Sequence, residues 1–113
     1  SLIDGGGGSV YDLVLIVGPL TAGSTGTAAV TGSSLGNAVQ LFNGSGLGSS
    51  TIPGLGVDLD IDNARKVAQG AANASGLAMI SRNLPARLSG LTVFLQAADT
   101  GGRISNIVTD TIL

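Results

Sequence analysis

The sequence contains no cysteine and no histidine. Without cysteine the chain forms no disulfide and offers no thiolate as a metal ligand or nucleophile. Without histidine it lacks the most common general base and the most common ligand of transition metals. Glutamate is absent too, so all seven acidic residues are aspartates, and neither a catalytic triad nor a convincing acid–base pair can be drawn from them. These absences predict a protein that is not an enzyme.

Charged residues are scarce, at 11% of the chain against an average of about 25%. The five basic residues are scattered and aromatic residues are few, so the clustered charge and stacking rings that bind nucleic acid are not expected. Apolar residues nevertheless make up 43% of the 113 residues, enough for one folded domain with one core. A surface with so few charges and so many small residues predicts extensive contact with other protein or with glycan.

Long apolar runs are missing as well. The longest, Leu13 to Val17, has five residues, whereas a helix needs about 20 to cross a bilayer. No basic segment precedes this run and Asp12 adjoins it, so it is not a signal peptide, and no membrane insertion is expected. The first residue is Ser1 and not methionine, which is expected of a processed, mature chain and equally of a trimmed one.

The chain divides into a glycine-rich N-terminal arm, residues 1–9, and a domain, residues 10–113. The arm contains four consecutive glycines, which lose more conformational entropy on ordering than any other residue. A neighbouring subunit is the simplest agent that would hold such a segment in place.

From residue 10 onward, short β-type runs alternate with Gly, Ser, Pro and Asn, which is typical of a sandwich or barrel. The pattern predicts an all-β fold, a seven-stranded antiparallel immunoglobulin-like β-sandwich. The strands are expected at residues 10–17, 25–31, 38–42, 57–62, 77–82, 91–98 and 104–113. Residues 43–56, with five glycines and one proline, are expected to form a long loop, and residues 64–72 a helical turn.

Most of the expected strands alternate apolar and polar residues, as half-buried antiparallel strands do. The first and last strands are apolar on both faces. Because a domain of this size has one core, we expect a partner to cover the second face. The predicted subunit interface therefore includes Val10, Leu13, Leu15 and Val17.

Phe42 and Phe94 are predicted to lie together on an outer face. Each shares its strand face with a glutamine, Gln40 or Gln96, and the two strands are neighbours in the immunoglobulin-like topology. The opposite phase would place both rings in the core and bury both glutamines, which is costly without partners. An aromatic pair on a nearly uncharged sheet indicates a contact surface, so both rings complete the predicted interface.

Several motifs occur in a recognisable order: GPLTAGSTGTAAVTG, VQLF, GLGVDLDID, QGAANASGLAMI, LTVFLQAAD and a closing SNIVTDTI. This order resembles that of a small immunoglobulin-like domain family from secreted and surface proteins of environmental Gram-negative bacteria. The resemblance covers residues 10–113 and is most specific at Gln96-Ala97 and Ser105-Asn106. It implies a β-sandwich, an extracellular or cell-surface location and no enzymatic activity. Because the family often has Cys or charged loops where this chain has Gly and Ser, no ligand is carried over.

Asp58, Asp60 and Asp62 alternate along one predicted strand, like the first half of a calcium-binding loop. Counted from Asp58, the positions that need Gly and Glu hold Asn63 and Gln69 instead. The three carboxylates would lie on one outer face about 6.6 Å apart, where calcium would relieve their repulsion. The favoured interpretation is a solvated edge strand whose charges prevent stray pairing.

Two sequons, at Asn43 and Asn73, lie in predicted loops and are candidate N-glycosylation sites. Loops rich in serine and threonine are candidates for O-linked sugar. Triplets of this kind arise easily by chance in such a composition, and unmodified loops are the favoured interpretation.

The leading functional hypothesis is a structural subunit of an extracellular polymer, such as a filament, sheath or surface layer, whose partners are copies of the same chain. A segment that includes residues 10–17 would add to a sheet edge of the next subunit by strand exchange. The alternative is a non-catalytic adhesion or carbohydrate-binding module with its ligand on loops 43–56 and 64–75. The absence of Trp argues against a sugar platform.

Overall fold

The computed structural model describes residues 11–113, so the predicted arm and Val10 lie outside the described residues. The described chain consists of strands joined by turns, with one short 3-10 turn, η1 (Ala86–Leu88). In chain order the strands are β1 (Val14–Val17), β2 (Thr25–Thr31), β3 (Ala38–Gly44), β4 (Gly46–Ile52), β5 (Val57–Asp62), β6 (Arg65–Ala71), β7 (Ala78–Asn83), β8 (Thr92–Asp99) and β9 (Val108–Thr111). Within these residues no helix has the length and apolar character needed to cross a membrane.

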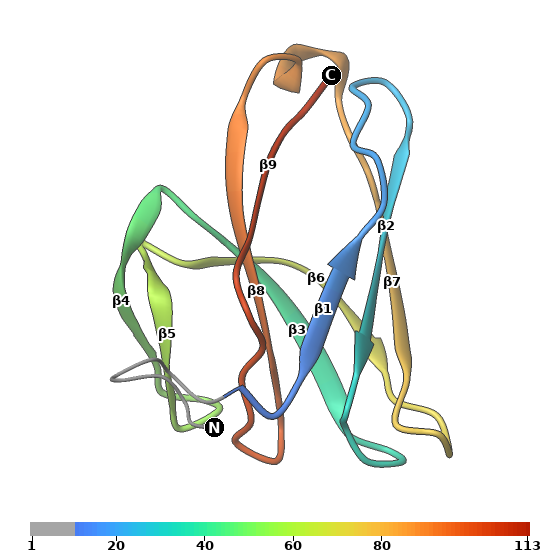
Figure 1. Cartoon of the computed structure of the whole chain (residues 1–113), viewed down its shortest axis with the longest axis vertical. Coiled ribbons are helices and arrows are strands. Elements are labelled where there is room, and N and C mark those ends of the chain that lie inside the picture. Colours follow the sequence, from blue (N-terminus) through green and yellow to red (C-terminus); the bar gives the residue numbers. More distant parts are fainter. Residues whose placement is uncertain (1–10) are drawn as a thin grey trace.

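The strands form two sheets and a separate hairpin (Figure 1). One sheet has the order β1-β2-β7, the other has the order β6-β3-β8-β9, and β4 pairs only with β5. All of these pairings are antiparallel. The prediction of an all-β, antiparallel sandwich is therefore confirmed.

Each predicted strand has a counterpart, but β4 and β6 are additional, so the predicted number of seven strands is wrong. The first and last strands are also shorter than expected: β1 covers Val14–Val17 where residues 10–17 were predicted, and β9 covers Val108–Thr111 where residues 104–113 were predicted. The predictions for β2 and β5 match at both ends, and those for β3, β7 and β8 agree to within two residues. The expected loop at residues 43–56 instead contains β4, and the expected helical turn at residues 64–72 is β6. Neither segment has an apolar alternation of its own: each forms by pairing, β4 with β5 and β6 with β3. Pairing with an ordered neighbour has overridden weak local propensity in both places.

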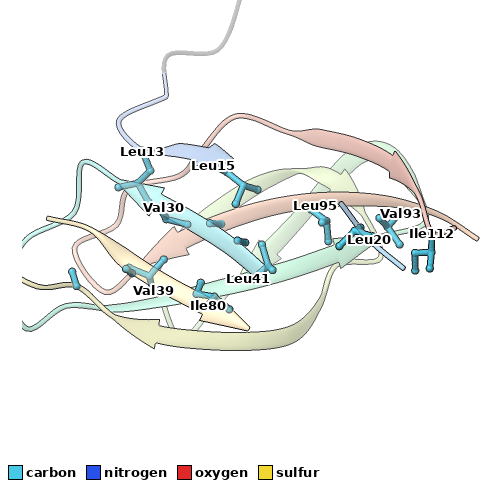
Figure 2. Close-up of a cluster of buried hydrophobic side chains, with 14 residues drawn as sticks. Leu13, Leu15, Leu20, Val30, Val39, Leu41, Ile80, Val93, Leu95 and Ile112 are labelled. Atoms are coloured by element: carbon cyan, nitrogen blue, oxygen red, sulfur yellow. The ribbon is translucent and has the colours of Figure 1, made fainter. Parts of the chain in front are cut away.

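The main core lies between the two sheets (Figure 2). Its buried side chains come from alternate positions of the strands, such as Leu15 of β1, Val30 of β2, Leu41 of β3 and Leu95 of β8. Because side chains point alternately to the two faces of a strand, each sheet contributes one face to this core.

The outer face of the four-stranded sheet is buried too, because the β4–β5 hairpin packs over it. A second cluster joins Phe42 of β3 to Leu59 and Ile61 of β5, with Phe94 of β8 packed against them. The expectation that a partner must cover the second face is therefore wrong for this sheet. The covering layer belongs to the chain itself, and the fold has three layers where the sequence predicted two.

A glycine allows the hairpin to lie close to the sheet. A Cβ atom on Gly44 of β3 would lie 2.7 Å from the Cβ of Ile61 and 2.8 Å from the carbonyl oxygen of Asp62. Both contacts are closer than a side chain tolerates, so the hairpin occupies the space that a side chain at position 44 would need.

Candidate functional site

An apolar cavity of about 210 Å³ opens between the two sheets, at the end of the sandwich where Val93 and Ile112 lie (Figure 2). Several positions that line it carry little or no side chain: Gly26 and Ala28 on β2 and Ala68 on β6. These small residues fill little of the space between the facing strands. The cavity follows from side-chain size along facing strands.

Arg82 lies at the mouth of this cavity. It shares the inward side of β7 with the buried Ile80, because the two are separated by one residue. The Arg82 guanidinium is exposed, and its Nη1 donates a hydrogen bond of 2.6 Å to the carbonyl oxygen of Val67 on β6. In the described part of the chain the only ion pair joins Arg103 to Asp99. The cation at the cavity mouth therefore has no carboxylate partner among residues 11–113.

The lining of the cavity offers contacts for an apolar group. Its walls are aliphatic, and its polar contributors are Thr27, Asn43, Ser81 and Arg82, none of which is paired with a general base. A cavity with aliphatic walls and one cation at its mouth favours a ligand that has an aliphatic part and a nearby carboxylate.

The structural role of Gln96 was not predicted from the sequence. It was expected on an outer face, yet it is fully buried at 0% exposure. Its Oε1 accepts a 2.8 Å hydrogen bond from the backbone N–H of Asp60, and its Nε2 donates a 2.8 Å hydrogen bond to the carbonyl oxygen of Ser105. Gln96 therefore ties the β4–β5 hairpin and the segment before β9 to the centre of the sheet. The two most specific motifs of the sequence, Gln96-Ala97 and Ser105-Asn106, meet in this network.

Ser105 completes the network from the other side. Its hydroxyl accepts a 2.8 Å hydrogen bond from the backbone N–H of Ala97 and donates one of 2.8 Å to the carbonyl oxygen of Asn106. Both side chains are satisfied internally, which is the condition under which buried polar groups persist. These residues are structural.

Asp99 forms a second buried polar site, at the end of the sandwich remote from the cavity. Its carboxylate accepts hydrogen bonds from the hydroxyl of Ser33 at 2.7 Å and from the backbone N–H groups of Gly101 and Arg103, both at 3.0 Å. Burial alone would raise the pKa of Asp99, but these bonds, one from Asn37 and the charge of Arg103 outweigh it, so the pKa is lowered. The group joins the β2–β3 loop to the 99–103 turn.

The three strand aspartates do not converge on a metal site. Asp58 accepts a 2.8 Å hydrogen bond from the Thr51 hydroxyl, and Asp60 accepts one of 2.8 Å from the Tyr11 hydroxyl. The side chains alternate outward, as predicted, and the described residues include no group of three or more acidic residues, histidines or cysteines placed to hold a metal ion.

The two sequons lie in different surroundings. Asn73 is exposed in the turn between β6 and β7, where its Oδ1 accepts the backbone N–H groups of Ser75 and Leu77. Asn43 is not in a loop: it is half-buried in β3, and its Oδ1 accepts the N–H of Phe94 at 3.1 Å. The predicted loop position of Asn43 is wrong, because the strand continues to Gly44.

The residues predicted for a subunit interface are mostly internal. Leu13 and Leu15 are buried in the main core of their own chain, and Val17 packs partly buried against it. Phe42 is 3% exposed and Phe94 is half-buried, both within the second cluster. The predicted exposed aromatic pair is therefore not formed. Both rings do lie on the predicted face of their strands, but the β4–β5 hairpin that covers this face was not predicted.

A different apolar surface is exposed. Val14 and Ile16, the β1 residues between the buried leucines, are 50% and 62% exposed, and Met79 of β7 is 63% exposed. Ile16 pairs with Ala29 of β2, and Ala29 pairs with Met79. These four residues, Val14, Ile16, Ala29 and Met79, form a strip across the outer face of the β1-β2-β7 sheet, which we call the outer strip.

No protein-family model matches the sequence, and the comparison with curated proteins finds no match.

Proposed function

We propose that this chain is an immunoglobulin-like domain that serves as a structural subunit of an extracellular protein polymer. The strand order supports the topology: β2 is followed by β3, and β7 by β8, so both connections cross from one sheet to the other. Crossings of this kind are typical of the Greek-key connections in immunoglobulin-like sandwiches. The β4–β5 hairpin is then an insertion between two strands of one sheet.

The outer strip is the observation that carries the proposal. It places three large apolar side chains, each at least half exposed, on one face of one sheet. Scattered exposed apolar residues are ordinary, but a contiguous row across three paired strands indicates a surface that another molecule covers. The low charge of the chain, 11% of residues, removes the repulsion that would keep copies apart.

Strand exchange remains part of the proposal in a more specific form. In the structure β1 pairs with β2 of its own chain. Exchange would therefore have to replace β1 by the same strand of a neighbour, with Leu13 and Leu15 entering the neighbour's core, as in domain swapping. Association through the outer strip needs no such replacement, because Val14 and Ile16 face outward while the leucines stay in place.

The test is the assembly state of the full chain as a function of concentration, by sedimentation velocity and negative-stain imaging. We expect assembly by the unmodified chain and a strong reduction in the double variant Ile16→Lys, Met79→Lys, because two charges would be buried in the contact. The matched control is the double variant Ser49→Lys, Gln69→Lys, because both residues are exposed, on β4 and β6, and neither belongs to the outer strip or lines the cavity. A chain that stays monomeric at every concentration, or double-variant chains that assemble as well as the control, would overturn the proposal.

The alternative, an adhesion or carbohydrate-binding module, has less support. The regions expected to carry a ligand are largely strands β4 and β6, and the cavity walls are aliphatic, whereas sugars need hydroxyl-bonding groups and flat aromatic rings. Retention of the monomer on an immobilised polysaccharide, with no self-assembly, would favour this alternative.

A further inference from the structure

We propose that the cavity of one subunit receives residues 2–4 of another, with Leu2 and Ile3 entering the cavity and Asp4 pairing with Arg82. This inference rests on the proposed self-assembly and names a contact for it. Residues 2–4 lie outside the described residues, so the argument uses their chemistry and the described geometry of the cavity.

The size and lining of the cavity match the aliphatic part of the segment. An apolar cavity of about 150 Å³ is enough to bind benzene, and this one measures about 210 Å³. It therefore has room for one or two branched aliphatic side chains. Leu2 and Ile3 are adjacent, and no other large apolar residue precedes Val10.

The charges also match. The Arg82 guanidinium donates one hydrogen bond to Val67, and a guanidinium has five N–H donors, so most remain available. Its fork geometry suits a carboxylate. Asp4 follows Leu2-Ile3 directly and is the only charged residue among residues 1–10. The cavity, with aliphatic walls and the Arg82 cation at its mouth, is therefore complementary to the Leu2-Ile3 pair with the adjacent Asp4 carboxylate.

The geometry favours a second copy as the donor. Asp12 lies at the opposite end of the sandwich, because a Cβ atom on Gly32 would lie 2.5 Å from its carbonyl oxygen. Arg82 of β7 pairs with Gly26 of β2, and Gly26 lies six residues before Gly32 in the chain. At about 3.3 Å per residue, Arg82 is therefore about 20 Å from Gly32 and from the neighbouring Asp12. The described chain moreover runs from this end towards the cavity, since Val17 lines the cavity.

The reach of the segment is short by comparison. Asp4 and Tyr11 are seven positions apart, and seven positions span at most about 25 Å when the chain is fully extended. A glycine-rich chain of that length has a mean end-to-end distance nearer 15 Å. To reach its own Arg82, the segment would have to reverse direction and then stretch almost fully. A neighbour stacked end to end removes both requirements, and contacts that join opposite ends of successive subunits propagate into a filament.

A charge-swap cycle on the full chain tests the pairing. We expect Arg82→Glu and Asp4→Arg each to weaken association at least tenfold, and the double variant Arg82→Glu, Asp4→Arg to recover most of the loss. The readout is the concentration at half-assembly in sedimentation velocity, with circular dichroism to confirm folding. Arg87→Glu combined with Asp4→Arg is the matched control, because Arg87 is exposed on η1 and does not line the cavity. Failure of the double variant to recover, with both single variants folded, overturns the pairing.

The aliphatic part is tested by methyl NMR spectra of the full chain. We expect the signals of Leu84 and Leu88, which line the cavity, to shift with concentration in the unmodified chain and not in Leu2→Ser, Ile3→Ser. Shifts that depend on Leu2 and Ile3 but not on concentration would mean docking within one chain, which overturns the proposal. Assembly that survives the Leu2→Ser, Ile3→Ser variant would overturn this inference while leaving the proposed polymer intact, whereas no assembly by any chain would remove both.

Discussion

The side-chain amide of Asn106 forms two hydrogen bonds with the backbone of Leu15, a residue 91 positions earlier in the chain. Its Oδ1 accepts the Leu15 N–H at 2.8 Å, and its Nδ2 donates to the Leu15 carbonyl oxygen at 3.2 Å. The N–H of Leu13 is also taken, by the carbonyl oxygen of Ile104 at 3.2 Å. The edge of β1 that faces away from β2 is therefore closed at these positions, as protected edge strands are.

Replacing Asn106 by Ala should destabilise the fold by about 1–3 kcal/mol, because it leaves two half-buried backbone groups without partners. Chemical denaturation measures this loss. Asn83→Ala is the control, because Asn83 is exposed and its side chain accepts a single hydrogen bond, from the Thr25 hydroxyl. Equal losses in the two variants would mean that the Asn106 bonds do not hold β1.

Replacing Gln96 by Leu should cost about 2–3 kcal/mol, since the Asp60 N–H and the Ser105 carbonyl oxygen both lose their partner in a buried site. Hydrogen exchange at the Asp60 amide should accelerate more than exchange at core amides of β2, because the hairpin is held to β8 through this bond. Gln69→Leu, on the exposed face of β6, should change stability by less than about 0.5 kcal/mol. An unchanged Asp60 exchange rate in Gln96→Leu would contradict this account of the hairpin.

Asp99 should make stability fall in acid. Its folded pKa is lowered from the ordinary value of 3.8, so the unfolded chain takes up the proton at the higher pH. The stabilising contribution is complete above the unfolded pKa and is lost as pH falls through it to the folded pKa.

The free energy of unfolding, measured between pH 2 and pH 6, should therefore drop below about pH 4 in the unmodified chain. Asp99→Asn should be less stable near neutral pH by about 1.5–3 kcal/mol and show a smaller drop in acid. Ser33→Ala removes the 2.7 Å hydrogen bond that helps to lower the pKa of Asp99, so the folded pKa comes closer to the unfolded one and the drop in acid should be smaller. An unchanged acid profile in Asp99→Asn would show that other groups control it.

Gly44→Ala should destabilise the protein by about 1–3 kcal/mol, because the new methyl group overlaps the backbone and the Ile61 side chain of β5. The matched control is Gly46→Ala in β4, where a Cβ atom would have no neighbour within 4 Å. Thermal unfolding distinguishes the two. A Gly44→Ala protein as stable as Gly46→Ala would mean that the hairpin does not press on β3 as closely as the structure has it.

Particular strands show how far the sequence could predict the fold. β2 and β5 carry strict alternation, which depends only on the chain itself, and both were predicted with correct ends. β4 is a Gly/Ser-rich strand of mixed exposure, and β6 has no buried residue, so neither carries a periodic signal. Strands that exist because a neighbour pairs with them leave little trace in their own residues.

The candidate site was harder to predict from the sequence than the strands were. The alternation placed Gln96 and Phe94 correctly on the strand face opposite Leu95. Whether that face is exposed to solvent depends on the β4–β5 hairpin, which comes from a different part of the chain and packs on it. The cost of burying a glutamine was a usable signal, since it implied either exposure or two partners, and the structure has the partners.

The sequence by itself determined the class of fold, the facing of most strands and the exclusion of cysteine and histidine chemistry, because composition and period-two patterning are local properties of the chain. Only the tertiary structure decided which apolar faces are covered. The hairpin buries the one expected to be open, the outer strip leaves another exposed, and small side chains on facing strands leave a cavity. Which faces are covered depends on how segments far apart in the sequence pack against each other. The distance between two packed layers is set by the side chains that meet between them, and the sequence does not show which side chains meet.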